Sequence, residues 1–464
     1  MNSDQASTPG EHAFINAPHK TLVSLSIPVL ISLIAEPLTG LVDTRFVASL
    51  GSTALAALGV GTVALSSFFW MFNFLGIGTQ TGVAQALGQN RQGHATRTTS
   101  LALSLGIAIG VALILIMLPL TDIIAGALGA TGLVRQQAVE YMDIRLYGAP
   151  AVLVTMVLFG ALRGVQDMRT PMWIAALVNG LNIVLDAILI FGYGPLPALG
   201  VAGSAYASTI SQWIGAGVVV VIVARKLGYT RDINFRDATA LLIVGRDLFF
   251  RTGLLFVFLL LATRVATQAG ANSGAAHQAI RQVFILTALV LEAFATTAQS
   301  LVGYFMGGGR LEIARKVANV TILWALGSGV AQAALMLAGQ DIVIQQLVPR
   351  TAIDVFVPAW IITSLAMPLN ALAFITDGIH WGSEDYKYLR NAMLLATIGG
   401  GIGLLLVNPA WQNALAWVWV ASLAWISIRA VFGLLRIWPG IGDSPWKRTV
   451  LVGSPAQPGV TPLP

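Results

Sequence analysis

Ionisable side chains recur inside the long apolar segments of this 464-residue chain. A charge at the centre of a bilayer costs at least about 2.5–3.5 kcal/mol, so each such residue needs a structural or chemical reason. Carboxylates held in a poorly solvated setting can bind and release protons or cations, which is the chemistry of an ion relay. The residues concerned are Glu36, Asp43, Arg45, Asp143, Arg145, Asp186, Arg264, Arg281, Glu292 and Asp377.

Asp43 and Asp186 are expected to lie at a similar depth and to form a site together. Asp43 lies in the outer part of an apolar segment that begins near Thr21, and Asp186 lies roughly 22 Å along another at 1.5 Å per residue. Asn182 precedes Asp186 by one helical turn and so shares its face. Two close carboxyl groups do not both ionise readily, which suits a reversible proton carrier. Carboxylate and amide oxygens could also hold Na⁺.

Several other charges are interpreted as structural pairs. Asp143 and Arg145 lie near the outer end of one segment and are expected to pair with each other. Asp377 lies near the cytosolic end of another segment and is also expected to be structural. Arg45 follows Asp43 by two positions and could pair with it.

A second group of residues is assigned to a substrate cavity or to a hinge. Glu292 lies in the middle of its segment, and the alternative to substrate contact is a buried pair with Arg264 or Arg281. Pro28 and Pro37 each remove an intrahelical hydrogen bond from the first segment, which permits a bend there. The cavity candidates are Glu36, Arg264, Arg281 and Glu292, and the hinge candidates are Pro28 and Pro37.

The elements that must position these residues are transmembrane helices. The chain is 56% hydrophobic and 10% charged, with a mean hydropathy of +0.78, whereas a soluble protein carries about 25% charged residues. Apolar runs long enough to cross a bilayer predict about twelve spans, each of about 20 residues or more. They lie at 21–47, 54–86, 98–120, 137–162, 172–192, 200–223, 248–270, 275–304, 317–338, 353–379, 391–408 and 413–435.

Charge distribution gives the orientation and bears on the possible partners. With both termini in the cytosol, most Arg and Lys residues fall in cytosolic loops, and the outer loops hold little beyond Arg135 and Arg350. The net charge of +6 therefore reflects orientation signals in short loops, and no nucleic-acid partner is expected. The expected location is the cytoplasmic (inner) membrane, with lipid around a chain expected to be monomeric. The tryptophans are expected mostly near span ends, as an aromatic belt that includes Trp360.

An internal repeat divides the chain into two bundles of six helices. Pro150 aligns with Pro368, GVQD at 164–167 aligns with GSED at 382–385, and the loop around Arg91 aligns with that around Arg310. Six is even, so the halves are parallel repeats related by a pseudo-two-fold axis along the membrane normal. The expected segments are a cytosolic tail (1–20), a first bundle (21–223), a charged cytosolic linker (224–247), a second bundle (248–436) and a cytosolic tail (437–464).

Membrane enzymes and ATP-driven pumps find little support in the sequence. It contains no cysteine, which excludes disulfides and thiolate sites, and it shows no Walker A loop, HExxH or GxSxG motif. Its histidines lack ligand spacing, so neither a metal site nor a cofactor is expected, apart from H⁺ or Na⁺ as a coupling ion. A passive channel suits buried carboxylates in a repeat less well than coupled binding does.

Several segments carry a family resemblance that covers essentially the whole chain. They are EPLTGLVDTRFVASLG, RLYGAPA, LRGVQDMRTP, NGLNIVLDAILIFG, GVAGSAYASTISQ, HQAIRQVFILTALVLEAFATTAQSLVGYFMGGG and TDGIHWGSED. With them the sequence resembles the multidrug and toxic compound extrusion (MATE) transporters, and within these the DNA-damage-inducible (DinF) branch. The resemblance implies export of organic, often cationic and drug-like substrates in exchange for a proton or Na⁺, by alternating access.

The resemblance also implies roles for particular residues. It assigns the coupling site to Asp43, Asn182 and Asp186, with Tyr141 and Ser204 as further members, and it favours H⁺ over Na⁺. Arg45 departs from the family motif, since related sequences often have a small or apolar residue there, and Arg264 and Arg281 place positive charge in the second half, which argues against purely cationic substrates. A flippase for a lipid-linked precursor is therefore the rival interpretation, since its cavity would favour anionic head groups.

Overall fold

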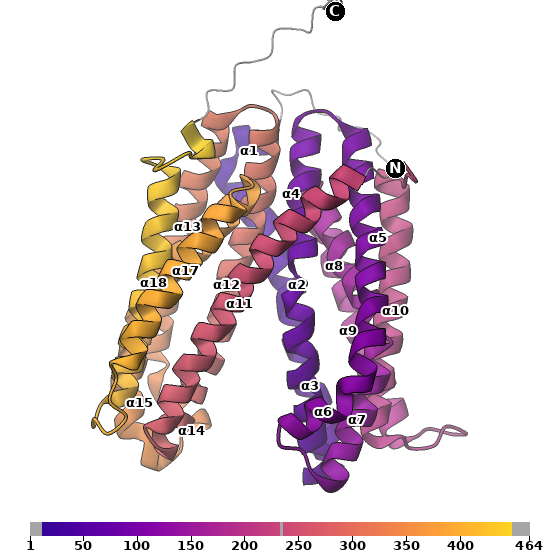
Figure 1. The fold of residues 1–464 in the computed structure, drawn as a ribbon, viewed down its shortest axis with the longest axis vertical. Helices are drawn as coiled ribbons and strands as arrows, with labels where there is room; N and C mark the ends of the chain where they lie inside the picture. Colours follow the sequence, from indigo (N-terminus) through magenta and orange to yellow (C-terminus); the bar gives the residue numbers. More distant parts are fainter. Residues whose placement is uncertain (1–11, 233–234, 448–464) are drawn as a thin grey trace, which may run out of the picture.

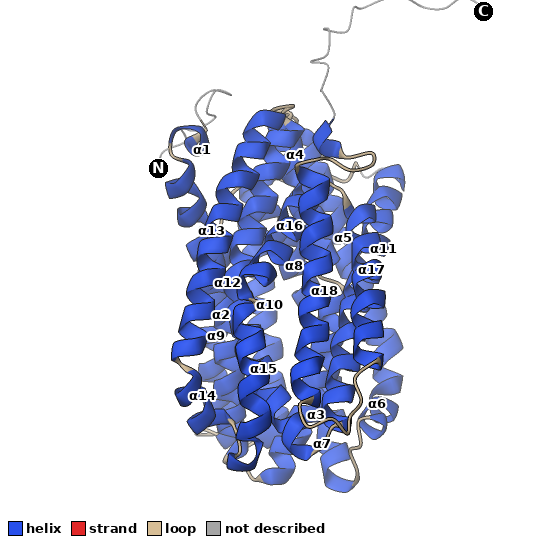
Figure 2. Ribbon diagram, turned by 90° about the vertical axis from the view of Figure 1, so that its left-hand side faces the viewer, coloured by secondary structure: helices blue, strands red, loops and turns tan. Residues whose placement is uncertain are grey.

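The structure, a computed structural model, describes residues 12–232 and 235–447. In these ranges the secondary structure is helical, apart from one isolated bridge between Tyr193 and Leu196 (Figure 2). Ten helices are long and apolar enough to cross a bilayer, and two further pairs are spans bent by 49°. With each bent pair counted once, these are the twelve spans that the sequence predicts. The predicted all-helical, polytopic fold is confirmed.

The helices fall into two sets along the chain. The first set is α1 (Ala13–Asn16), α2 (Pro18–Ala48), α3 (Ser52–Met71), α4 (Phe74–Gly88), α5 (Gln92–Met117), α6 (Thr121–Ala127), α7 (Gly132–Leu146), α8 (Ala149–Gly164), α9 (Arg169–Phe191) and α10 (Gly200–Leu227). The second set is α11 (Phe235–Gln268), α12 (Ala271–Gly307), α13 (Leu311–Ala338), α14 (Gln340–Leu347), α15 (Ile353–Leu365), α16 (Met367–Gly382), α17 (Tyr386–Leu405) and α18 (Ala414–Ile437).

The two bent spans have the same local cause. The bends separate α7 from α8 and α15 from α16. Pro150 and Pro368 each occupy the first turn of the helix that follows the bend. Proline is well tolerated there because the first-turn N–H groups have no intrahelical acceptor. The aligned prolines of the repeat therefore mark equivalent breaks.

The two sets form two bundles that meet at one end and diverge toward the other (Figure 1). We call them the first lobe (α2–α10) and the second lobe (α11–α18), and we call the end where they meet the joined end. The predicted linker is largely helical, because α10 continues to Leu227 and α11 begins at Phe235. Phe14 and Trp446, both in predicted tails, are fully buried. Residues 1–11 and 448–464 of these tails lie outside the described residues.

Polar contacts that follow the internal repeat anchor equivalent loops in the two lobes. Asp167 accepts a hydrogen bond from Lys226 at the end of α10. Its counterpart Asp385 accepts from Arg436 at the end of α18, with Nε to Oδ2 at 2.6 Å. Burial opposes ionisation of Asp167, but hydrogen bonds from Lys226 and Thr170 hold its pKa below the usual value. The aligned GVQD and GSED motifs thus have the same role in both halves.

Close helix packing also repeats between the lobes. A Cβ atom on Gly164 would lie 2.7 Å from the carbonyl oxygen of Gln80, and one on Gly382 would lie 2.6 Å from that of Gln299. These distances are too short for any side chain, so glycine lets α8 lie directly against α4, and α16 against α12. The same two-helix unit therefore forms the inner wall of each lobe.

Hydrogen bonds between the lobes join α4 to α12. The Gln80 amide nitrogen donates to the carbonyl oxygen of Thr296 at 2.7 Å. The Gln299 amide nitrogen donates to the carbonyl oxygen of Ile77 at 2.8 Å. Gln80 and Gln299 are equivalent in the repeat, so the contact is close to symmetric. It holds the lobes together on the side toward the joined end.

Substitution of Gly88 by alanine is expected to separate the lobes at the joined end. A Cβ atom on Gly88 of α4 would lie 2.0 Å from the carbonyl oxygen of Tyr304 in α12, and only a shift of one lobe relieves that clash. Because the chain has no cysteine, spin labels can be placed by Gln92→Cys and Glu312→Cys. Double electron–electron resonance should show longer distances in Gly88→Ala than in the parent.

Gly93→Ala is the matched control for this prediction, because a Cβ atom at Gly93 meets nothing within 4 Å. Its distance distribution should equal that of the parent. An unchanged distribution in Gly88→Ala would contradict the lobe contact described above.

Helix α2 contacts both lobes along its length. Near its start, Leu22 is buried in a hydrophobic cluster of the second lobe, and Ser26 donates to the Thr297 hydroxyl at 3.0 Å. Its later turns pack on α9 of the first lobe. Pro28 and Pro37 lie within this helix, which is continuous from Pro18 to Ala48. The two prolines thus follow the part of α2 that is bound to the second lobe.

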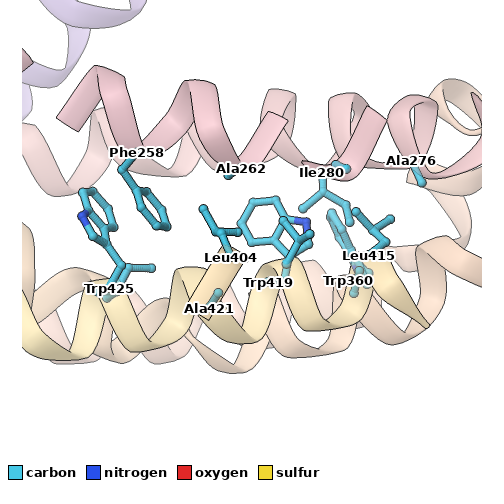
Figure 3. Close-up of a cluster of buried hydrophobic side chains, with 14 of the residues drawn as sticks. Phe258, Ala262, Ala276, Ile280, Trp360, Leu404, Leu415, Trp419, Ala421 and Trp425 are labelled. Atoms are coloured by element: carbon cyan, nitrogen blue, oxygen red, sulfur yellow. The ribbon is translucent and has the colours of Figure 1, made fainter. Parts of the chain in front are cut away.

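Aromatic packing fills the core of the second lobe (Figure 3). The Phe258 ring stacks on Trp425 with centroids 4.6 Å apart and planes 2° apart. Trp360 is fully buried and donates its indole N–H to the carbonyl oxygen of Met336 at 3.0 Å. The prediction that Trp360 belongs to an interfacial belt is therefore wrong, since its N–H has a partner inside the protein.

Candidate functional site

Helices α2, α9 and α10 bring the predicted coupling residues together in the first lobe. Asn182 and Asp186 lie one turn apart on α9, and both are buried, with Asp186 fully so. Helix α10 approaches closely because Gly203 has no side chain, and a Cβ atom there would lie 2.5 Å from the carbonyl oxygen of Leu189. Ser204, next in the chain, is also fully buried. The polar cluster is thus enclosed by close helix packing.

Asn182 links α2, α9 and α10 by hydrogen bonds. The surrounding network assigns its amide so that the nitrogen donates to Asp43 Oδ1 at 3.2 Å. In that orientation the amide oxygen accepts from the backbone N–H of Ser208 at 3.1 Å and from its hydroxyl at 3.2 Å. The amide therefore fixes the position of Asp43 relative to the other two helices.

The carboxyl groups of Asp43 and Asp186 lie within hydrogen-bonding range of each other, and Ser204 lies beside Asp186. Neither oxygen of Asp186 receives a well-aligned hydrogen bond from an N–H or O–H group of the described residues. Two ionised carboxylates in contact would repel each other, whereas a proton between them satisfies both. The arrangement can therefore accommodate one proton between the two carboxyl groups.

Arg145 of α7 supplies positive charge to this cluster, which the sequence interpretation missed. Its charge acts on Asp43, on Asp186 and on Glu36 of α2. A hydrogen bond to the Gln212 side-chain oxygen, 2.7 Å long, holds the guanidinium group toward α10. Three carboxyl groups therefore surround one arginine, and Glu36 extends the cluster along α2.

The predicted pairs Asp143–Arg145 and Asp43–Arg45 are not found among the described ion pairs. Residues two apart on a helix point to different sides, so neither pair could face one another. Asp143 faces Thr121 at the start of α6. Arg45 is exposed. The spacing of two residues already indicates that Asp143 and Arg145 lie on different sides of the helix and do not pair.

The contacts of Tyr141 lie apart from the carboxyl pair. It is buried in the apolar cluster of the first lobe, and its ring packs on Gly61 of α3. None of the hydrogen bonds found in the described ranges joins it to Asp43 or Asp186. Its role at the coupling site stays a prediction.

Asp377 is the centre of a buried ion-pair cluster in the second lobe. Arg251 of α11 and Arg429 of α18 both donate to its Oδ2 atom, from Arg429 at 2.7 Å. All three side chains are buried. The guanidinium of Arg429 also lies 4.5 Å from the ring centroid of Trp425. The predicted structural role of Asp377 fits this arrangement, although the sequence did not identify its partners.

The predicted pairing of Glu292 with Arg264 or Arg281 is wrong. The arginines whose charges act on Glu292 are Arg251, Arg163 and Arg429. Arg264 is exposed on α11. The charge of Arg281 acts on His277 rather than on Glu292. Helical periodicity could not reveal this, because Arg163 belongs to the other lobe.

A cavity of about 130 Å³ lies where the two lobes meet. Glu292 and Trp381 line it from the second lobe, and Arg163, Phe159 and Asn73 line it from the first. Among the described residues, no group of three or more histidine and carboxylate side chains converges as a metal site would. The oxygens of Asp43, Asn182 and Asp186 remain the candidate ligands for Na⁺.

Sequence comparison identifies relatives along nearly the whole chain. The MatE family model matches residues 28–188 and 248–405. The DNA damage-inducible protein F of Escherichia coli (strain K12) is 29% identical over 446 residues, covering 92% of this chain and 93% of the relative. Protein DETOXIFICATION 44, chloroplastic, of Arabidopsis thaliana is 28% identical over 459 residues, covering 94% and 85%.

Solved structures share the fold. A crystal structure of MATE in the bent conformation superposes with a TM-score of 0.83 at 24% identity, covering 90% of this chain and 94% of that one. An outward-facing MATE family transporter of the MOP superfamily gives 0.82 at 23% identity, covering 93% and 97%. The two matched ranges of the family model fall one in each lobe. The chain therefore belongs to the MatE family of multidrug efflux transporters, resembles the DinF proteins within it, and is a multi-pass membrane transporter rather than an enzyme.

Proposed function

We propose that this transporter exports organic small molecules in exchange for protons that bind at Asp43 and Asp186. The observation that carries the proposal is the contact between the fully buried carboxyl group of Asp186 and the half-buried carboxyl group of Asp43. A proton is the ion that such a contact needs, and Na⁺ is the alternative. Relatives named "Probable multidrug resistance protein NorM" support drug-like substrates; the one from Thermotoga maritima is 29% identical over 309 residues.

Competition within the first lobe explains how export and proton uptake are coupled. A cationic substrate near Glu36 and the aspartate pair favours the ionised carboxylates, and proton binding removes that attraction. Arg145 limits the negative charge left after the proton departs. Substrate release and proton binding therefore accompany each other.

The arrangement of the lobes supports alternating access. They meet at the joined end, near which the described chain begins and ends (Figure 1). With both termini in the cytosol, as the distribution of basic residues favours, this conformation opens away from the cytosol. Bending of α2 at Pro28 and Pro37 links the carboxyl pair to the second lobe. The proposed setting is the cytoplasmic membrane, with the chain as a monomer.

The proposal is tested by ethidium efflux from cells that lack their major pumps. The proton gradient and the Na⁺ gradient are removed separately, at matched expression. Efflux should stop when the proton gradient collapses and should persist without Na⁺. Efflux that follows only the Na⁺ gradient would overturn proton coupling. No efflux at all would favour the flippase, and loss of a surface glycan on deletion would then support it.

A further inference from the structure

The cavity between the lobes brings together opposite charges that lack direct partners. Arg163 lines it from α8 and Glu292 lines it from α12. Each affects the other electrostatically, yet neither forms an ion pair within the described part of the chain. Both side chains are half-buried, and partial removal of a charge from water is costly, so a group of opposite charge in the cavity would stabilise each of them.

Hydrogen-bond donors without acceptors line the cavity from both lobes. The indole nitrogen of Trp381 is buried and has no partner in the described ranges, and the same holds for Nε of Arg163. The Arg251 guanidinium lies 5.3 Å from the Trp381 ring centroid, which adds positive charge behind the indole. Buried polar groups in proteins are nearly always satisfied, and an anionic or carbonyl oxygen placed in the cavity would supply the acceptor that both donors lack.

We propose that this cavity binds the charged end of a zwitterionic solute, with its carboxylate on Arg163 and Trp381 and its ammonium group on Glu292. The inference rests on the proposed export function and names a substrate class for it. A volume of about 130 Å³ holds a small head group. Phe159 and Met156 also line the cavity and provide apolar contact for the rest of the solute.

Because the cavity lies between the lobes, a ligand bound there would respond to the lobe movement that transport requires. Arg163 belongs to the first lobe and Glu292 to the second, so one zwitterion would contact both. Movement of the lobes would separate the two charges and weaken both contacts together. A compound with only one charge would make only one of the two ionic contacts.

The test uses three probes with one ring system: tryptophan, tryptamine and indole-3-propionate. Binding of tritiated tryptophan to the purified full-length protein is measured directly, and the other two compete. Tryptophan should bind at least tenfold tighter than either single-charge probe. Equal affinities, or tightest binding of indole-3-propionate, would overturn the proposal, because the cavity would then hold water or a simple anion.

Charge-removing variants assign the contacts. Glu292→Gln should weaken the binding of tryptophan at least tenfold and leave the affinity for indole-3-propionate unchanged. Arg163→Gln should weaken the binding of tryptophan and leave the affinity for tryptamine unchanged. Glu312→Gln and Arg350→Gln remove exposed charges outside the cavity and should change nothing. Equal effects of both cavity variants on all three probes would overturn the assignment. If a variant fails to fold, the relative affinities of the three probes for the wild-type protein still test the proposal.

Ethidium efflux measured in parallel separates this inference from the proposed function. Proton-driven efflux without a preference for tryptophan would overturn the zwitterion site alone. A tenfold preference for tryptophan without gradient-driven efflux would support the site and overturn the proposed function.

Discussion

Asp186→Asn should abolish proton-driven ethidium export while leaving the protein folded. Asparagine has nearly the same shape as aspartate and can still hydrogen-bond to Asp43 and Ser204, but it cannot exchange a proton at neutral pH. Asp43→Asn should have the same effect, because the pair shares one coupling proton. The measurement is the initial efflux rate under an imposed proton gradient, at matched expression.

Asp122→Asn is the matched control for both variants. Asp122 is an exposed carboxylate at the start of α6, paired with Arg135 at 2.5 Å. Exposed pairs are worth about 0–1 kcal/mol, so the variant should retain full export. Gradient-driven export that survives in both Asp43→Asn and Asp186→Asn would move the coupling site elsewhere in the protein, with Glu292 as the next residue to test.

Asp377→Ala should cause the largest loss of stability of any single substitution in the second lobe. It would remove the carboxylate to which both Arg251 and Arg429 donate, leaving two buried like charges without a directly paired counter-ion. Removing one partner of a buried ion pair costs about 3–5 kcal/mol. The expected result is a lower melting temperature in detergent and a smaller monodisperse fraction on size exclusion.

Asp341→Ala provides the comparison, because Asp341 is exposed in the first turn of α14. Its melting temperature should stay close to that of the wild type. If Asp377→Ala melts as the wild type does, the two arginines must be solvated or neutral, and the buried cluster described here would be incorrect.

The spans and the carboxyl pair were predictable because they depend on local properties. Apolar length fixes the helices, and depth along two helices places Asp43 and Asp186 at one level. Which residues share a helix face is also a local property, and it identified Asn182. The 49° bends follow from the aligned prolines only in hindsight, since a membrane helix also tolerates proline without a sharp bend.

The partners of the remaining charges depend on tertiary packing, which one sequence does not specify. Arg145 was assigned to Asp143 by proximity along the chain, although the side chains face different helices. Glu292 was assigned to arginines of its own half, whereas Arg163 reaches it from the other lobe. Spacing along a helix restricts which residues share a face, but helix packing decides what that face contacts.

The most direct test of proton coupling uses the purified protein in liposomes that contain a trapped pH indicator. A pH gradient is imposed in the absence of Na⁺, and ethidium is added to liposomes that contain the wild type, Asp43→Asn or Asp186→Asn. The indicator then reports how fast the pH gradient dissipates. Ethidium should dissipate the gradient through the wild type and leave it unchanged with either variant. Equal dissipation by all three proteins, or ethidium transport that requires a Na⁺ gradient, would contradict proton binding at Asp43 and Asp186.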